Sequence, residues 1–274
     1  MLKSLLIFAL VAGSWNLKWF PSGRAEHRAS ERVEAANIAD AADVVRSNLK
    51  GCGRVMFLQE MRDAQSCSNL VAAIGDSKLK VAVVSAFRDF RDNRLQWQQL
   101  GIVTDMPVIE AKWKYSKMTN GMFVPRGYAY ALLDGGKEGR IACFCVHLKS
   151  NYGARKQEKK MENMRKREAG IRQVLEAATS CGADKVLIAG DFNSDRFQNG
   201  FKGERIFAML ESGGFRDGWE GTPLSGRGTH PGNTHYRDST IDYVFYKGYS
   251  RCVSGSLAPA VPVSDHRMLI MVLE

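Results

Sequence analysis

Short apolar runs recur along the whole chain, and amphipathic segments separate them. Ten runs have the length and composition of β-strands, namely 5–15, 55–59, 81–86, 100–104, 108–115, 128–133, 141–148, 185–190, 241–246 and 268–273. Four segments read as helices: 26–49, 64–74, 156–178 and 204–212. Strands and helices mixed in one continuous chain predict an α/β fold in which two sheets pack together with helices outside.

The composition describes a protein with a large core and a basic surface. The 274 residues are 45% hydrophobic, which excludes a disordered or collagen-like chain. Lysine and arginine number 39 against 29 aspartates and glutamates, a formal net charge of +10. This charge favours a polyanionic partner, such as nucleic acid, anionic lipid or a phosphorylated substrate. A basic surface without such a partner remains the alternative.

Six cysteines are too few for a disulfide scaffold at this length, and none forms a Cys-x-x-Cys pair that would indicate a zinc site. Cys143 and Cys145 share one side of an apolar strand, and we predict that both are small core residues.

The N-terminus allows two interpretations. Lys3 and the apolar residues 5–13 resemble a signal peptide, and the same residues also read as the start of the first strand. If residues 1–13 are a signal peptide, we expect a secreted or periplasmic protein, and otherwise a cytoplasmic one. The run is too short to span a membrane, so we expect no stable membrane insertion.

Polar side chains collect where predicted strands begin or end. Glu60, His147 and Asp191 each follow an apolar run. Asp242 lies at the start of another run, and His266 shortly precedes the last. Each residue alone has an ordinary structural explanation, as a turn or an exposed strand end. Their repetition at five strand ends instead indicates a functional site on a rigid sheet.

The residue types at these positions point to metal-assisted chemistry. Glu60, Asp191, Asp242 and Asp265 would repel one another if they met, unless a cation compensates their charge. Carboxylate and amide oxygens suit Mg²⁺, with Mn²⁺ or Ca²⁺ as alternatives. Histidines add proton transfer or charge stabilisation near neutral pH. These are the parts of metal-assisted phosphodiester hydrolysis.

Six ordered motifs resemble those of the endonuclease/exonuclease/phosphatase superfamily, which has the DNase I-like fold. They are Ser14-Trp15-Asn16, Gln59-Glu60, Val146-His147-Leu148-Lys149-Ser150, Gly190-Asp191-Phe192-Asn193, Ile241-Asp242-Tyr243 and Ser264-Asp265-His266. The resemblance implies a four-layer α-β-β-α sandwich of two mostly antiparallel sheets packed face to face, with outer helices. It also implies that residues 14–274 form a single domain. Glu60 would be the principal metal ligand, with Asn16 beside it and a contribution from Asp265.

The resemblance also implies catalytic roles. Asp191 would orient or deprotonate the attacking water, and Asn193 would hold the scissile phosphate. His266, supported by Asp242, would stabilise the transition state or act as general acid or base. His147 would hydrogen-bond the phosphate or protonate the leaving oxygen. DNases pair this histidine with a glutamate, whereas Gln98 stands near that place here. A glutamine cannot stabilise an imidazolium as a carboxylate does.

The remaining candidates concern the substrate. Arg126 resembles the arginine that some members use on the phosphate. Lys149, Asn151 and Tyr152 follow His147, and Tyr152 could insert beside a ribose or a base. The segment 149–172 holds nine lysines and arginines against three glutamates. It is either a track for a phosphate backbone or a solvated helix face.

These features together predict a Mg²⁺-dependent nuclease that hydrolyses DNA phosphodiester bonds, acting as a monomer. A phosphatase or a phospholipid phosphodiesterase of the sphingomyelinase type is the alternative within the same superfamily. A binding module with a dead site is the third reading. The retention of Glu60, His147, Asp191, Asn193 and the Asp242 and His266 pair argues against it.

Overall fold

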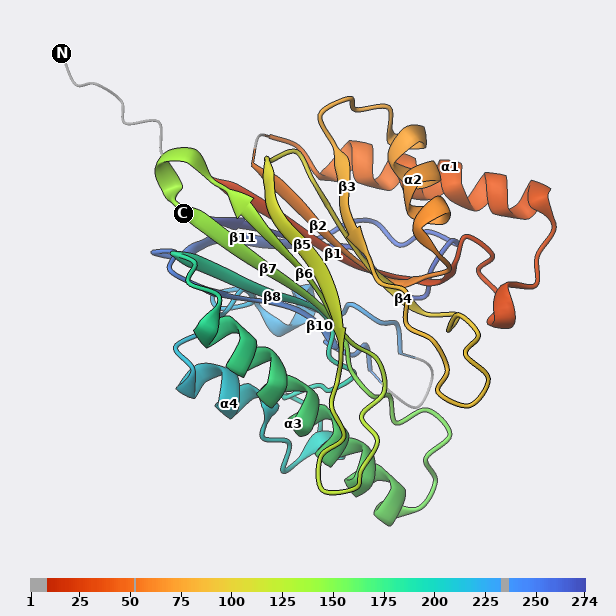
Figure 1. The fold of residues 1–274 in the computed structure, drawn as a ribbon, viewed down its shortest axis with the longest axis vertical. Coiled ribbons are helices and arrows are strands. Elements are labelled where there is room, and N and C mark those ends of the chain that lie inside the picture. Colours follow the sequence, from red (N-terminus) through yellow and green to blue (C-terminus); the bar gives the residue numbers. More distant parts are fainter. Residues whose placement is uncertain (1–8, 52, 233–236) are drawn as a thin grey trace.

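The computed structural model describes residues 9–51, 53–232 and 237–274. Two six-stranded sheets pack face to face, with helices on both outer faces (Figure 1). This is the predicted DNase I-like α/β sandwich. Within the described ranges, no helix is long and apolar enough to cross a membrane.

The first sheet has the strand order β11-β12-β1-β2-β4-β3. Its strands are β1 (Leu10–Phe20), β2 (Arg54–Met61), β3 (Lys80–Val84), β4 (Gln99–Thr104), β11 (Cys252–Leu257) and β12 (Leu269–Leu273). The second sheet has the order β5-β6-β7-β8-β10-β9. Its strands are β5 (Val108–Tyr115), β6 (Gly127–Asp134), β7 (Arg140–His147), β8 (Lys185–Asp191), β9 (Arg216–Asp217) and β10 (Asp242–Lys247). The β1-β2 and β7-β8 pairs are parallel, and every other pair is antiparallel.

Helices α1 (Glu31–Asn48) and α2 (Ala64–Ile74) pack on the first sheet, whereas α3 (Gln157–Ser180) and α4 (Ile206–Ser212) pack on the second (Figure 1). Four short 3-10 turns complete the set: η1 (Ala25–His27), η2 (Gly136–Glu138), η3 (Asn199–Phe201) and η4 (Leu224–Gly226). Local chemistry sets the ends of α2. The side chain of Asp63 accepts a hydrogen bond from Ser66 N, and Gly75 ends the helix at φ 74°.

Strand β1 contributes side chains from its two faces to two separate hydrophobic cores. Val11 and Trp15 lie in the cluster under α1 and α2, and Leu10 and Ala12 lie in the cluster between the sheets. Successive side chains on a strand point to opposite faces, so a central strand that is buried on both sides reads as one apolar run. Cys143 and Cys145 are buried, free thiols in the second sheet, as predicted.

Several predicted boundaries were wrong. The helix predicted over 26–49 begins only at Glu31, because Glu26 and His27 have positive φ values of 58° and 54° and form a separate turn. Strands β9 and β11 had not been predicted. β9 has only two residues, and β11 is an edge strand whose small polar residues carry no apolar signal. The strand predicted over 5–15 is described from Leu10 onward, and residues 1–8 of that prediction and of the signal-peptide interpretation lie outside the described residues.

Candidate active site

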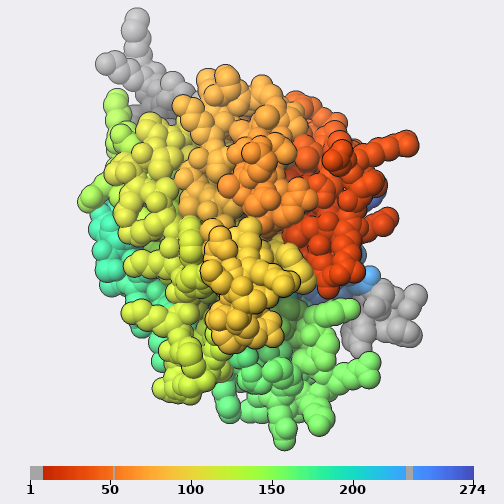
Figure 2. Space-filling view, turned by 45° about the vertical axis from the view of Figure 1, so that its right-hand side comes forward, coloured from red at the N-terminus to blue at the C-terminus, as the bar shows by residue number. Residues whose placement is uncertain are grey.

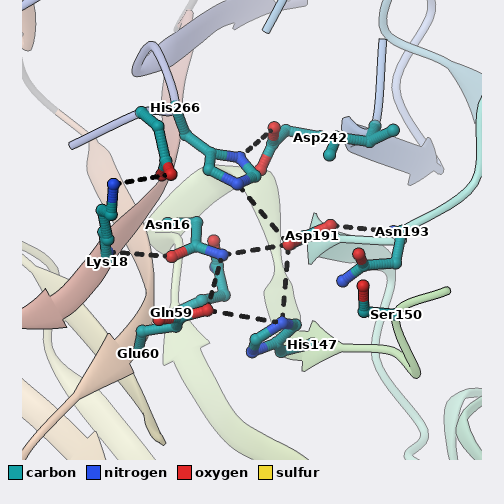
Figure 3. Close-up of polar contacts among 12 residues, drawn as sticks. Asn16, Lys18, Gln59, Glu60, His147, Ser150, Asp191, Asn193, Asp242 and His266 are labelled. Atoms are coloured by element: carbon teal, nitrogen blue, oxygen red, sulfur yellow. Dashed lines mark hydrogen bonds and ion pairs between the residues drawn. The ribbon is translucent and has the colours of Figure 1, made fainter. Parts of the chain in front are cut away.

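The two parallel strand pairs bring their carboxyl ends to one edge of the sandwich. Asn16 is in register with Gln59 in the first sheet. In the second sheet Asp191 is in register with both His147 and Asp242. The residues that follow or end these strands therefore meet across the two sheets (Figure 3). The structure brings together the predicted candidates from both sheets in this way.

Asp191 lies at the centre of the group (Figure 3). Its Oδ2 atom accepts a 3.0 Å hydrogen bond from Asn16 Nδ2 and lies 3.5 Å from Nε2 of His147 and 3.9 Å from Nε2 of His266. Its Oδ1 atom accepts a 2.8 Å hydrogen bond from the backbone N–H of Asn193. One carboxylate thus faces an amide and both histidines.

Burial and neighbouring charge make the Asp191 carboxyl unusually basic. Its side chain is almost inaccessible, and Asp242 pairs with it across the sheet. Burial, followed by the repulsion of Asp242, raises the pKa of Asp191 to about 7. A group with this pKa can take up a proton near neutral pH.

His266 forms a buried pair with Asp242. Its Nδ1 atom lies 2.8 Å from Oδ2 of Asp242, and Trp15 Nε1 donates to its carbonyl oxygen at 2.9 Å. Burial by itself disfavours the charged ring, but attraction to Asp242, the hydrogen bond with it and the nearby Asp191 outweigh burial. Together they raise the pKa of His266 to about 10. His266 is therefore an imidazolium at neutral pH.

His147 has the opposite character. Burial, and then the positive charges of Arg126 and His266, lower the pKa of His147 well below its usual value. Its ring is therefore neutral, and its buried Nδ1 atom has no hydrogen-bond partner among the residues that the structure describes. Of the two predicted roles for His147, this environment favours hydrogen bonding over donation of a proton.

Gln98, which stands near the place of the DNase glutamate, binds Arg126 in this structure. Oε1 of Gln98 accepts a 2.8 Å hydrogen bond from the guanidinium of Arg126. Arg126 also donates to the carbonyl oxygens of His147 at 3.0 Å and Leu148 at 3.1 Å. A half-buried guanidinium requires several acceptors, and Gln98 supplies one of them. Arg126 thereby braces the end of β7, and the negative charges of Glu60 and Asp191 attract its guanidinium.

Glu60 offers carboxylate oxygen atoms to a cation, whereas Asn16 turns its Nδ2 atom toward Glu60 and Asp191, and its Oδ1 atom accepts a 3.0 Å hydrogen bond from the backbone N–H of Lys18. Oε1 of Glu60 accepts a 3.3 Å hydrogen bond from Asn16 Nδ2, and Oε2 accepts one from the backbone N–H of Trp19 at 3.0 Å. Asp191 adds a second buried carboxylate, and the neighbouring His147 is uncharged. Hard oxygen donors with this charge fit a divalent ion such as Mg²⁺.

Asp265 is placed differently from the other predicted metal ligands. Its carboxylate pairs with Lys18 Nζ at 2.9 Å, so a protein cation already balances it. Asp265, His230 and His266 also offer ligand atoms that lie within 4.8 Å of one another. Asp191, Asp242 and His266 form a second such group.

Backbone strain is concentrated at this edge of the sandwich. Lys18, Trp19, Glu60, Arg126 and Asn193 all have φ values between 48° and 61°. Residues other than glycine rarely adopt this region, and such outliers cluster at functional sites. At Glu60 the pairing of β2 with β4 is also irregular between Leu58 and Met61. These residues lie in or next to the ends of β1, β2, β6 and β8 that carry the site side chains.

The loop after β7 is held mainly by α3. Nδ2 of Asn163 donates to Oδ1 of Asn151 at 3.3 Å, and Arg167 donates to the carbonyl of Lys149. Asn151 thus supports the loop through its side chain. Tyr152 is 95% exposed and free to meet a substrate. Burial, and then the charges of Arg126 and Lys166, lower the pKa of the half-buried Lys149.

The basic stretch is less uniform than the sequence suggested. Arg167 is fully buried in an ion pair with Glu204, so it contributes no charge to the surface. Lys159 and Lys166 share Glu162. Exposed positive charge remains at Arg155, Lys156, Lys160, Arg165 and Arg172.

The structure places Trp19 at the rim of the site and not in the core. Its side chain is only partly buried, and its ring centroid lies 6.1 Å from that of Trp97, which is 49% exposed. Strand alternation would have put Trp19 on the same face as Trp15. The left-handed residues Lys18 and Trp19 break that alternation, and nothing in the residue types announces this.

Comparison with known proteins agrees with the fold. Residues 161–266 match the model of the Endonuclease/Exonuclease/phosphatase family. An endonuclease/exonuclease/phosphatase from Beutenbergia cavernae DSM 12333 superposes with a TM-score of 0.68 at 18% identity, over 97% of this chain and 71% of that one. An endonuclease/exonuclease/phosphatase family protein from Leptotrichia buccalis C-1013-b superposes with a TM-score of 0.67 at 13% identity, over 97% of this chain and 99% of that one. D. rerio TDP2 complexed with a single-strand DNA product superposes with a TM-score of 0.63 at 17% identity, over 98% of this chain and 100% of that one. No curated protein sequence matches the chain.

Proposed function

We propose that this chain, which has the fold and the family signature of the endonuclease/exonuclease/phosphatase superfamily, is a divalent-metal-dependent phosphodiesterase that hydrolyses nucleic acid, with DNA as its substrate. The observation that carries the proposal is the position of Asp191. Its buried carboxylate lies between the neutral ring of His147 and the charged ring of His266, next to Glu60 and Asn16.

This arrangement supplies the groups that water attack on a phosphodiester needs. Asp191, with its raised pKa, accepts the proton of the attacking water. The imidazolium of His266 faces the negative charge that grows on the phosphoryl oxygens, and Asp242 keeps it oriented. His147 donates a hydrogen bond from a neutral ring. A divalent ion held by carboxylate oxygens of Glu60, with Asn16 beside it, would neutralise charge on the phosphate.

Charge and the solved neighbours favour nucleic acid over other phosphodiesters. The formal charge of +10 and the exposed basic residues at the start of α3 suit a polyanion. A protein of the same fold, D. rerio TDP2, has been solved with a single-strand DNA product. Lys149 follows the end of β7 and Arg126 braces it, so both place positive charge next to the site.

Three substrates, each incubated with Mg²⁺ and with EDTA, test the proposal: plasmid DNA, an inositol polyphosphate and sphingomyelin. We expect Mg²⁺-dependent nicking of the plasmid alone, and no nicking by the Asp191→Asn variant. Linear oligonucleotides then distinguish endonucleolytic from exonucleolytic cleavage. Release of phosphate or phosphocholine with intact plasmid would overturn the nuclease and assign the site to phosphatase or lipid chemistry.

A further inference from the structure

Two tryptophans, one at the end of β1 and one in the loop before β4, meet beside the candidate metal ligand. Trp19 follows Asn16 at the end of β1, and its backbone N–H binds Oε2 of Glu60 at 3.0 Å. Trp97 precedes β4, and its neighbour Gln98 binds Arg126, which in turn binds the carbonyl of His147. The backbone of Trp19 and the residue next to Trp97 therefore contact groups of the candidate site or their supports, which places both rings close to it.

Both tryptophans are held in place. The ring of His27 packs edge-on against Trp19 with centroids 5.8 Å apart, and its Nε2 atom lies 2.6 Å from the carbonyl oxygen of Trp97. His27 thus ties the loop of η1 to the loop before β4. In Figure 2 the gold atoms that precede β4 lie against the red atoms of the N-terminal segment. Trp97 nevertheless keeps 49% of its surface exposed.

A rigid, exposed indole offers a flat face that suits another π system. The catalytic site next to it would hold a phosphodiester, and the +10 charge favours a polynucleotide. We infer that Trp19 and Trp97 form a stacking subsite for an unpaired nucleobase adjacent to the scissile phosphate. A base can lie on an indole only when it has left its duplex, so the subsite makes the enzyme prefer single-stranded or frayed substrates.

The inference rests on the proposed nuclease function, and the experiment separates the two. A single-stranded oligonucleotide carries one ordinary phosphodiester among phosphorothioate linkages. A second oligonucleotide is identical but lacks the bases on both sides of that linkage. Wild-type protein should cleave the first with a KM about tenfold lower than the second. If it cleaves neither, and no other nucleic acid, the proposed function fails before the subsite is tested.

Variants of Trp97 and of a control residue are compared on both oligonucleotides. Trp97→Ala should raise KM about tenfold for the substrate with bases and leave KM unchanged for the substrate without them. Trp97→Phe should recover most of the loss, because it restores an aromatic face. Phe90→Ala is the matched control, since Phe90 is a 76% exposed ring in the same loop. It should behave as wild type.

Binding provides a readout apart from activity. In EDTA, oligo(dT) should quench the tryptophan fluorescence of Asp191→Asn protein, and the additional Trp97→Ala change should remove most of that quenching. A loss of cleavage by Trp97→Ala that is equal for both oligonucleotides would overturn the subsite, because it would assign Trp97 to holding the loop. Equal cleavage of duplex and single strands by the wild type would also overturn it.

Discussion

Asp242 holds the ring of His266 through the 2.8 Å contact between its Oδ2 atom and Nδ1. This contact turns the other nitrogen, Nε2, toward Asp191 at 3.9 Å. Asp242 opens β10 in the second sheet, and His266 precedes β12 in the first. The pair therefore forms only when the two sheets are packed, which makes it a sensitive reporter of the assembled site.

Replacing Asp242 with asparagine should lower the pKa of His266. Attraction to Asp242 and the hydrogen bond with it raise the pKa of His266 to about 10, against an ordinary value near 6.5. NMR titration of the histidine rings in EDTA measures this value in the wild type and in Asp242→Asn. A His266 that titrates near 6.5 in the wild type would contradict the pairing.

The same pair should make stability depend on pH. Because the pKa of His266 is higher in the folded chain, its contribution is fully present below about pH 6.5. That contribution is lost as the pH rises through about 10. Urea unfolding in EDTA at pH 6.5 and pH 10 should therefore show a larger loss of stability for the wild type than for Asp242→Asn.

Asp191→Asn should abolish turnover without destabilising the fold. Asparagine cannot take the proton of the attacking water, so we expect activity to fall by orders of magnitude. It also removes a buried charge that burial and Asp242 disfavour, as the raised pKa of Asp191 indicates. In EDTA at pH 8, the variant should therefore melt at or above the temperature of the wild type. Normal turnover would eliminate Asp191 from the mechanism.

Much of this site was predictable because its residues follow buried strands. The apolar runs before Glu60, His147 and Asp191 have the pattern of central strands, and such strands end at a common edge when their pairing is parallel. The range predicted for α2, 64–74, likewise agrees with the structure, in which Asp63 and Gly75 flank the helix. Both predictions depend on local patterns, which a sequence displays directly.

Other features depend on contacts between distant residues. Arg167 reads as part of a charged helix face, yet Glu204 pairs with it in the interior. Gln98 stands near the place of a DNase glutamate, and its side-chain oxygen accepts a hydrogen bond from the distant Arg126. Trp19 leaves the core because Lys18 and Trp19 itself adopt left-handed backbone. Residue type alone predicts neither the partner of a buried charge nor a strained turn.

Glu60→Gln should raise the concentration of Mg²⁺ that the reaction needs. The substitution keeps the shape of the side chain and its oxygen acceptor for the backbone N–H of Trp19, but removes the charge that attracts a cation. We expect the half-saturating Mg²⁺ concentration to rise about tenfold or more. Calorimetric titration of Mg²⁺ without substrate provides an independent check. An unchanged Mg²⁺ dependence would show that the ion binds elsewhere.

Charge reversal at the start of α3 should weaken binding of polynucleotides but spare small substrates. The variant combines Lys156→Glu, Lys159→Glu and Lys160→Glu, and these three lysines are exposed. Each lost phosphate contact reduces the salt dependence of binding, so both affinity and its salt slope should fall. Bis(4-nitrophenyl) phosphate, which is too short to reach α3, should be hydrolysed at the normal rate.

The control for this variant reverses Lys50, Lys78 and Lys80, which are exposed and removed from the site. Lys80 pairs with Thr104, and Thr104 pairs with Val55 near the start of β2, at the opposite end from Glu60. The control changes net charge equally. If it weakens DNA binding as much, then overall charge, and not a track on α3, determines the affinity.

Gly190→Ala should destabilise the protein strongly and thereby remove activity. Gly190 has φ 145°, and a Cβ atom there would lie 1.9 Å from the carbonyl oxygen of Val146 on the neighbouring strand. The strands β7 and β8 would have to separate immediately before His147 and Asp191, at a cost of about 3 kcal/mol. Gly200→Ala is the matched control, because a Cβ atom at Gly200 meets nothing within 4 Å. Its unfolding free energy should change by less than about 0.5 kcal/mol. Equal urea midpoints for the two variants would show that β8 tolerates a side chain at this position, and that the close approach of β7 does not fix the site.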